Sequence, residues 1–343
     1  MLENRETAQF ERLLALLNGI DAKTIFLFCH HNADPDALCS AYALSKLLER
    51  TVPNAEVTIA APQGLSKLSK QVLTRISTKI AVSPSIEGAD AIILLDTSTL
   101  QQLDDWRSRI ECCKKPLIVV DHHITHPETE TVSTLQIVDE HSSSACEVVF
   151  ELFKEASIKP RAKEALAIFI GMTYDTKHFS IANSNTFKTA AELIGLGARA
   201  EEAFSLLEMP MDSSERIARL KAAGRLQLVR LGEWLLALSS VNSYQASAAR
   251  GLISLGAHVA VVSGKREGKL RINMRSSREF YLKTKIHLGR DIAETLGIYV
   301  KGMGGGHSTS AGVNGEGDVE TTLSKCLELF RGKLLKHSFA SIS

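Results

Sequence analysis

The sequence predicts an α/β protein whose N-terminal part is a mostly parallel sheet flanked by helices. Two observations favour this fold class. Strand-like apolar runs alternate with helical stretches through the first half of the chain, and such alternation is typical of parallel sheets. Four of the apolar runs also lead directly into acid or histidine residues, which is how an open parallel sheet gathers ligands at its carboxyl edge.

The first half is expected to begin with an amphipathic helix over residues 4–19, which carries apolar residues on one face. Strands are then expected at 24–29, 55–60, 89–95 and 117–120, with helices at 35–50, 143–156 and 160–174. Residues 186–230 are rich in alanine, leucine and charged residues, and Met209-Pro210-Met211 interrupts them. We interpret this stretch as a helical connector.

From about residue 233 the pattern indicates a smaller, second α/β domain. Its expected strands are WLLALSSV, HVAVVSG and KLRINMRS, and its expected helices lie at 244–255, 288–297 and 318–335. The predicted organisation is therefore an N-terminal domain over 1–190, a helical connector over 191–230 and a C-terminal domain over 231–337.

Composition narrows the class of protein further. The 343 residues carry 40 Lys+Arg against 39 Asp+Glu, a formal charge of +1, so the chain has no overall attraction to nucleic acid or membranes. No run approaches about 20 apolar residues, and the N-terminus lacks the apolar core of a signal peptide. Because the six cysteines form no C-x-x-C pair, we expect reduced thiols without a catalytic role. These features predict a cytoplasmic protein with no membrane partner.

Candidate metal ligands follow the four apolar runs. The first run, IFLFC, is followed by a segment that contains His30, Asp34 and Asp36. The second run, AIILL, is followed by Asp96, and the third, PLIVV, by Asp121-His122-His123. The fourth run, AIFIGMTY, lies within the helix expected over 160–174 and is followed by Asp175. Clustered carboxylates repel one another unless a cation neutralises them. Mixed carboxylate and imidazole ligands suit two first-row divalent ions such as Mn²⁺, with one carboxylate bridging. The ligands therefore predict phosphoryl-ester hydrolysis.

Simpler interpretations exist for each residue alone. Asp96 and Asp175 could cap helices, and His122-His123 could be a surface turn. The coincidence of acid and histidine residues at four such positions favours the metal site over these alternatives. Four further histidines are not assigned as ligands, and structural or supporting roles are expected for them; they are His31, His126, His141 and His178.

In these residues the chain resembles the DHH phosphoesterase superfamily. The matching motifs are H-x-x-x-D-x-D, a strand-end Asp, D-H-H and a fourth strand-end Asp followed by Thr; the residues are His30, Asp34, Asp36, Asp96, Asp121, His122, His123, Asp175 and Thr176. The sequence Gly304-Gly305-Gly306-His307 resembles the signature of the accessory DHHA1 domain. The resemblance covers about residues 20–335 and extends to the nanoRNase, pAp phosphatase and RecJ-like branches.

The resemblance also implies a role for each matching position. His30 and Asp34 would bind one Mn²⁺. Asp36, His122 and Asp175 would bind the second ion, and Asp96 would bridge the two. Mg²⁺ or Co²⁺ would be substitutes for Mn²⁺. Asp121 would orient a site histidine, and His123 would face the scissile phosphate. The chain departs from the family at three positions, with Ala33 for the common Pro, Cys39 for a small Gly, and Lys177 for the usual Gly. None of these changes removes a ligand, but Lys177 puts substrate preference in question.

In the second domain, Gly304, Gly305, Gly306 and His307 are expected to form a Gly-rich loop whose backbone N–H groups could bind a phosphate. Arg275 and Ser276 end a cationic strand, and Arg275 can bind phosphate in bidentate fashion. With the metal domain, these residues predict a Mn²⁺-dependent phosphodiesterase. Its expected substrates are short RNA or single-stranded DNA, with pAp and linear dinucleotides as additional ones.

Other functions remain open at this point. The same metal domain could hydrolyse a cyclic dinucleotide such as c-di-AMP, although the membrane segments usual in such enzymes are not evident in the sequence. A pyrophosphatase would lack the Gly-Gly-Gly-His sequence. A non-catalytic nucleic-acid-binding or scaffold protein of this fold would tend to lose acidic ligands. Homodimerisation, cleavage polarity and the preference between RNA and DNA are not fixed by the sequence.

Overall fold

The computed structural model describes residues 8–209 and 211–340, and it divides into two compact units after Met209. Each unit contains one six-stranded sheet. The helices expected between 186 and 230 are shared between the two units, because α8 (Ser184–Gly195) and α9 (Ala200–Leu207) belong to the first and α10 (Ser213–Gly224) to the second.

The sheet of the first unit is parallel throughout, with strand order β3-β2-β1-β4-β5-β6. Its strands are β1 (Thr24–Cys29), β2 (Glu56–Ala60), β3 (Ile80–Ala81), β4 (Ala91–Leu95), β5 (Leu117–Asp121) and β6 (Leu135–Val138). The central strands β1, β4 and β5 are almost wholly buried. Continuous apolar runs of this kind are what a sheet covered on both faces requires.

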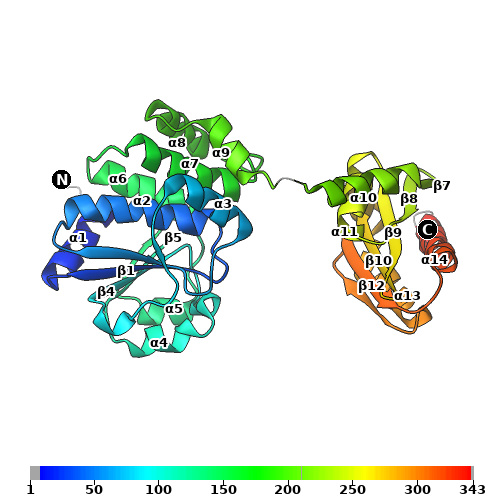
Figure 1. Ribbon diagram of the computed structural model, residues 1–343, viewed down its shortest axis with the longest axis horizontal. Helices are drawn as coiled ribbons and strands as arrows, with labels where there is room; N and C mark the ends of the chain where they lie inside the picture. The colour runs from blue at the N-terminus through cyan, green and yellow to red at the C-terminus, as the bar shows by residue number, and fades with distance from the viewer. Residues whose placement is uncertain (1–7, 210, 341–343) are drawn as a thin grey trace. The chain divides into compact units, whose positions relative to one another are not determined.

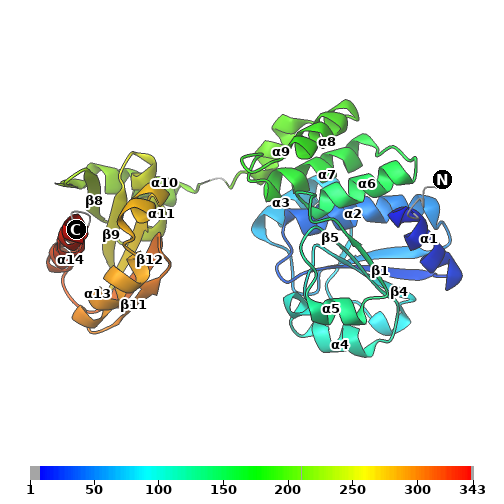
Figure 2. The ribbon, with the colours of Figure 1, turned by 180° about the vertical axis from the view of Figure 1, so that it is seen from behind.

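Helices cover both faces of this sheet (Figures 1 and 2). On one face lie α1 (Gln9–Gly19), α2 (Pro35–Thr51), α3 (Lys67–Ile76), α6 (Ala145–Glu155) and α7 (Ala162–Asp175). On the other lie the shorter α4 (Trp106–Cys112) and α5 (Pro127–Val132), with 3₁₀ turns at Ile86–Gly88 and Leu100–Leu103. Alternate residues of β1 enter the two separate cores, Leu27 on the α2 side and Phe28 on the α4 side.

The second unit has strand order β11-β12-β10-β9-β8-β7, antiparallel except for the parallel pair β8 and β9. The strands are β7 (Gln227–Leu231), β8 (Trp234–Ser240), β9 (Val259–Arg266), β10 (Lys269–Ser276), β11 (Met303–Gly306) and β12 (Ser310–Gly315). The helices are α10, α11 (Gln245–Ser254), α12 (Arg278–Thr284), a π-helical turn at Leu288–Ala293, α13 (Glu294–Tyr299) and α14 (Val319–Ala340). Separate cores lie on the two faces, one against α14 and one against α10 and α11.

The architecture confirms the predicted α/β fold class, with two corrections to the predicted elements. Asp175 ends α7, which confirms the helix expected over 160–174, and it does not follow a strand as the strand-end motif predicted. Gly304, Gly305 and Gly306 form the edge strand β11, paired with β12, and are not a loop. Within the described residues, no helix has both the length and the apolar character needed to cross a bilayer.

Candidate metal centre

The candidate ligands of the first unit meet because their strands are neighbours. β1, β4 and β5 lie side by side in parallel, so the residues after them emerge at the same edge. The chain also changes direction here, since β2 and β3 lie to one side of β1 and β4 to β6 to the other. Such a switch point leaves a crevice outside the carboxyl ends of the strands, where α/β proteins bind ligands.

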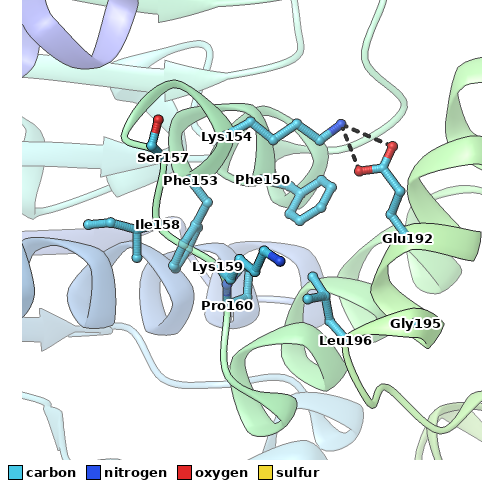
Figure 3. Close-up of a pocket in the computed structure, with 10 residues that line it drawn as sticks. All are labelled: Phe150, Phe153, Lys154, Ser157, Ile158, Lys159, Pro160, Glu192, Gly195 and Leu196. Atoms are coloured by element: carbon cyan, nitrogen blue, oxygen red, sulfur yellow. Dashed lines mark hydrogen bonds and ion pairs between the residues drawn. The ribbon is translucent and has the colours of Figure 1, made fainter.

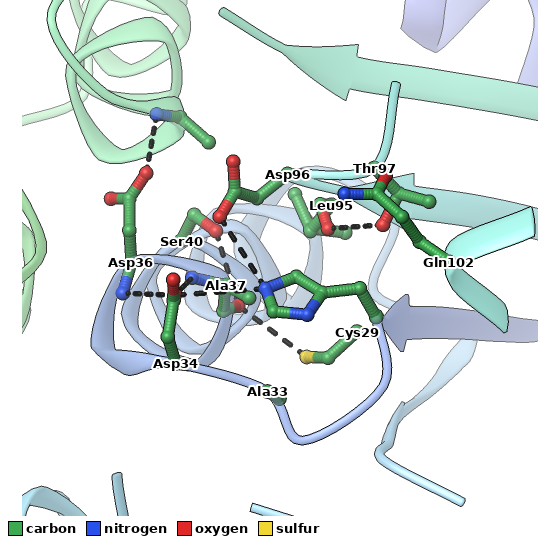
Figure 4. Close-up of polar contacts among 12 residues, drawn as sticks. Cys29, Ala33, Asp34, Asp36, Ala37, Ser40, Leu95, Asp96, Thr97 and Gln102 are labelled. Carbon is green, nitrogen blue, oxygen red and sulfur yellow. Dashed lines mark hydrogen bonds and ion pairs between the residues drawn. The ribbon is translucent and has the colours of Figure 1, made fainter. Parts of the chain in front are cut away.

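His30, Asp34 and Asp96 form the first group of potential ligands. His30 Nε2 lies 3.7 Å from Asp34 Oδ1 and 3.7 Å from Asp96 Oδ2. Asp34 caps α2, because its Oδ1 accepts hydrogen bonds from the backbone N–H of Asp36 at 3.0 Å and Ala37 at 3.1 Å. The cap fixes this carboxylate at the start of the helix, on the side of Asp36 and Asp96 (Figure 4).

Asp36 is fully buried in the first turn of α2. Its carboxylate accepts hydrogen bonds from the backbone N–H groups of Ala145 at 2.6 Å and Cys146 at 3.1 Å, at the start of α6. The N-terminal end of a helix favours negative charge, so α6 offsets part of the cost of burying this carboxylate. Gly171 of α7 is required here, because a Cβ would overlap Asp36 Oδ1 and Cys146 Sγ.

His122 lies close to the remaining candidate ligands. Its Nε2 lies 3.0 Å from Asp175 Oδ2 and 3.6 Å from Asp96 Oδ1. Two sets of atoms close enough to hold a metal ion therefore share Asp96: Asp36, Asp96, His122 and Asp175 form one, and His30, Asp34 and Asp96 form the other. A third overlapping set contains Asp96, Asp121, His122 and His123.

Asp121 contacts the two histidines that follow it. Its Oδ1 accepts from the backbone N–H groups of His122 at 2.6 Å and His123 at 3.1 Å, and it lies 3.0 Å from His123 Nδ1. Asp121 is fully buried, whereas the side chain of His123 is 54% exposed. The carboxylate therefore holds an imidazole that faces outward, and it favours the tautomer with the proton on Nδ1.

The electrostatics of the site fit divalent cations. Burial raises the pKa of Asp36, and the charges of Asp175 and Asp96 raise it further. Burial also raises the pKa of Asp96. Burial lowers the pKa of His30, but the hydrogen bond and charge of Asp34 outweigh this and raise it to about 9. The pKa of His122, also lowered by burial, is raised to about 11 by Asp175 and Asp96.

Both shifts have the same kind of cause, because the negative charge of the carboxylates favours the protonated form of the neighbouring imidazoles. Among the described residues, Asp96 Oδ1 is also a buried side-chain atom without a hydrogen bond, and the buried His122 Nε2 has only an ion-pair contact with Asp175 and Asp96. Unpaired buried atoms with metal-ligating chemistry fit a divalent ion that the protein would bind at this position.

Two comparisons place the chain among known proteins. The model of the "DHH family, N-terminal domain" matches residues 24–172. An uncharacterized protein of Methanocaldococcus jannaschii is 32% identical over 317 residues, which are 92% of this chain and 94% of that protein. The chain belongs to the DHH family. DHH proteins are metal-dependent phosphoesterases, and the chain is an enzyme of this class.

Other similar proteins are more distant or match only in part. The Bacillus subtilis protein named bifunctional oligoribonuclease and PAP phosphatase NrnA is 30% identical over 189 residues, 54% of this chain and 56% of that protein. The crystal structure of an exopolyphosphatase-related protein from Bacteroides fragilis has a TM-score of 0.61 and 18% identity, and it covers 97% of this chain and 98% of the other. This structure supports the fold alone.

The turn after Asp175, the last candidate ligand, accommodates Lys177. Lys177, His178 and Phe179 all have positive φ, at 50°, 56° and 64°. Lys177 therefore adopts the left-handed conformation that glycine adopts more easily, which places a long cation two residues after Asp175. Thr176 supports the turn, because its Oγ1 accepts a hydrogen bond from the Phe179 N–H at 3.1 Å.

The predicted substrate-binding residues of the DHHA1-like region lie together in the second unit. Arg275, half-buried near the end of β10, donates a hydrogen bond to Ser310 Oγ on β12. Ser276 is buried, and its hydroxyl has no hydrogen bond within the described part of the chain. His307 follows β11 and is exposed.

The glycines of β11 differ in what surrounds them. A Cβ on Gly304 would overlap the carbonyl of Ala293, and one on Gly306 would overlap that of Ser310. A Cβ on Gly305 would meet nothing within 4 Å. Close packing therefore explains Gly304 and Gly306, and only Gly305 leaves open space.

Two features of the first unit could not be predicted from the sequence. The backbone N–H groups of Ala145 and Cys146 carry no residue signature, and only the packing of α6 against α2 reveals them. A largely apolar pocket of about 540 Å³ lies between α6 and α8 (Figure 3), lined by Phe150, Phe153, Lys154, Ser157, Ile158, Lys159, Pro160, Glu192, Gly195 and Leu196. It contains none of the candidate metal ligands.

Proposed function

We propose that the chain is a Mn²⁺-dependent phosphodiesterase that hydrolyses short oligonucleotides, RNA and also short single-stranded DNA, to mononucleotides. Linear dinucleotides and pAp are proposed as further substrates. The observation that carries the proposal is the pair of ligand sets that share Asp96. The partial similarity to a protein named oligoribonuclease and PAP phosphatase supports the substrate class. Homodimerisation and a cytoplasmic location stay predictions.

Each ligand is proposed to have a defined place. His30 and Asp34 would hold one ion. The other ion would be held by Asp36, His122 and Asp175, and Asp96 would contribute to both. Manganese suits this mixture of oxygen and nitrogen ligands, and Mg²⁺ or Co²⁺ would be substitutes. When bound, such a pair lowers the pKa of water and offsets the charge that develops on the phosphoryl oxygens.

Residues of the protein would also assist the protonation of the leaving oxygen. In the hydrolysis, a water oxygen bonds to phosphorus, the bond from phosphorus to the leaving ribose oxygen breaks, and that oxygen gains a proton. His123 faces outward with its Nδ1 against Asp121, so its Nε2 is free to face the substrate. We assign His123 as the group that stabilises the phosphate or gives the proton to the leaving oxygen, and Asp121 as the residue that positions it.

Arg275, Ser276, Gly304, Gly305, Gly306 and His307 are proposed to bind substrate phosphate. Arg275 supplies a guanidinium, and Ser276, the next residue of the strand, is proposed to add its unpaired hydroxyl as a further donor. No role is proposed for these residues in the chemical step.

Substrate profiling tests this function directly. Mn²⁺-loaded protein is incubated with labelled RNA and DNA of about two to ten nucleotides, with pAp, and with cyclic dinucleotides. We expect mononucleotides from the short linear substrates and a decrease of at least about 100-fold in turnover for Asp96→Ala. Cleavage of cyclic dinucleotides alone would replace the proposal with the cyclic-dinucleotide alternative. Binding without cleavage of any substrate would favour the scaffold alternative.

A further inference from the structure

Strand β7 leaves one edge of the second unit's sheet without a partner strand. It lies at the end of the strand order (Figure 1), and among the described residues β8 is the strand that pairs with it. Leu231 pairs with Trp234 across the turn that contains Gly232, so alternate residues of β7, beginning with Leu231, direct their backbone groups toward β8. The N–H and C=O groups of Leu228 and Arg230 therefore point to the free edge.

The two sides of β7 differ in how well they are covered. Val229 and Leu231 pack against the core that includes residues of α14. Leu228 pairs with Ala237, which belongs to the core on the opposite side, so Leu228 points to that side. The helices there, α10 and α11, pack on β8, β9 and β10. Leu228 is left 59% exposed, an apolar side chain directly beside unpaired backbone groups.

Strand β7 also lacks the features that usually prevent an edge strand from pairing with another chain. Such edges are protected by charged side chains, by proline or by a bulge. The strand has no proline, and its register with β8 is continuous. Arg230 is its one charged residue, and Arg230 Nε donates a hydrogen bond to the Gly232 carbonyl at 3.0 Å, in the turn. An edge of this kind favours the addition of a further strand.

A second copy of the chain presents a matching strand. Two β7 strands that pair antiparallel in one sheet are related by a two-fold axis perpendicular to the sheet. Directly opposite residues then point to the same side. Among the residues of β7, Leu228 can therefore face the partner's Leu228 or the partner's Arg230.

An axis at Leu228 fits the side chains best. It brings the two Leu228 side chains together, and their free N–H and C=O groups can bond to each other across the axis. Each Arg230 then faces the partner's Leu226, which is 38% exposed, and the aliphatic part of the arginine can cover it. An axis at Val229 would separate the two exposed leucines. An axis at Arg230 would place two arginines opposite each other, which is destabilising.

We propose that two copies of the chain associate through β7, antiparallel about a two-fold axis at Leu228, and so join their second units in one continuous sheet. The inference goes beyond the proposed function and does not depend on it. Because the strand is short, we expect a weak dimer, with a dissociation constant of the order of 10–100 µM, as is typical of interfaces below about 1,200 Å².

Sedimentation equilibrium of the full-length protein tests the dimer. Over about 1–500 µM, a range that brackets such a dissociation constant, the wild-type mass should rise from one chain toward two. Leu228→Glu should stay monomeric, because two carboxylates would face each other across the axis. A monomeric wild type over the whole range would overturn the proposal. So would dimerisation of Leu228→Glu, which is the result expected if Leu228 faced the partner's Arg230.

A mixture of two variants tests the register. Leu228→Lys should also be monomeric alone, whereas an equimolar mixture of Leu228→Lys and Leu228→Glu should dimerise, because opposite charges then face each other. A mixture that stays monomeric would exclude the axis at Leu228. The matched control is Leu255→Glu, since Leu255 is a 71% exposed leucine that follows α11 in the same unit, and it should dimerise as the wild type does. Melting temperatures of the dilute variants should equal that of the wild type, because the changes are at exposed positions.

Hydrogen exchange tests the backbone pairing itself. The amides of Leu228 and Arg230 should exchange more slowly in concentrated than in dilute wild-type protein, because their N–H groups become bonded across the new strand pair. The same amides should show no dependence on concentration in Leu228→Glu. Dimerisation without slower exchange at these amides would mean that the copies meet through another surface, and it would overturn the proposal.

Discussion

Two aspartates of the candidate metal centre show how one residue type takes different tasks after neighbouring strands. Asp96 presents a buried Oδ1 without a hydrogen bond, between His122 and His123 at 3.6 and 3.5 Å. Asp121 Oδ1 is occupied by the N–H groups of its own chain. An unpaired oxygen is available to a cation, whereas an oxygen with several donors orients the groups that donate to it.

This difference predicts opposite results for two isosteric substitutions. Asp96→Asn should abolish metal-induced stabilisation and turnover, because it removes a ligand common to both sets. Asp121→Asn should keep the metal-induced stabilisation but lower kcat about 10- to 100-fold with little change in KM, because His123 loses its orientation. Thermal melts with and without Mn²⁺ and steady-state kinetics measure both variants. If Asp121→Asn instead loses metal binding as Asp96→Asn does, Asp121 is a ligand and not a positioning residue.

At the scale of single elements, the glycines of strand β11 differ in whether packing requires them. Gly304 faces the core, where Ala293 of the π-helical turn leaves no room for a side chain. Gly305 faces the outer side and is sterically free. The sequence predicted one phosphate-binding loop from this run, and the structure separates a packing glycine from an exposed one within a strand.

The two glycines therefore form a matched pair for a stability measurement. Gly304→Ala should lower the free energy of unfolding by about 1–3 kcal/mol, because backbone must move to admit the methyl group. Gly305→Ala should change it by no more than about 0.5 kcal/mol, the usual range for a surface position. Urea denaturation of the two variants and the wild type gives the comparison. Equal destabilisation by both changes would contradict this account of β11.

Elements also show which parts of the site the sequence could predict. The residues after β1, β4 and β5 could be predicted to meet, because short apolar runs indicate parallel strands and parallel strands end at one edge. The apolar run before Asp175 fits a strand or a buried helix equally well by periodicity, and it proved to be α7. The N–H donors to Asp36 could not be predicted, because they depend on a helix start more than 100 residues away in the sequence.

At the scale of the whole molecule, the two units have separate hydrophobic cores. Residues of α2, α6 and α7 and the parallel strands fill the cores of the first unit, and residues of β8 to β10, α11 and α14 fill those of the second. All candidate metal ligands belong to the first unit, and all predicted phosphate-binding residues belong to the second. A bound metal ion should therefore stabilise the first unit, and phosphate bound by the predicted residues should stabilise the second.

Calorimetry with Mn²⁺ tests this division of the molecule. Two cooperative transitions are expected, because multidomain chains with separate cores do not unfold as one unit. An ion that binds only the folded state stabilises it by about 2.7 kcal/mol at 100 times its dissociation constant. For a unit of about 200 residues this corresponds to a rise of about 5–10 °C in melting temperature. The rise should occur in one transition only and vanish in Asp96→Asn, whereas Leu228→Glu should retain it in full. If Mn²⁺ shifts both transitions, or if the rise in melting temperature persists in Asp96→Asn, the metal binds elsewhere in the chain.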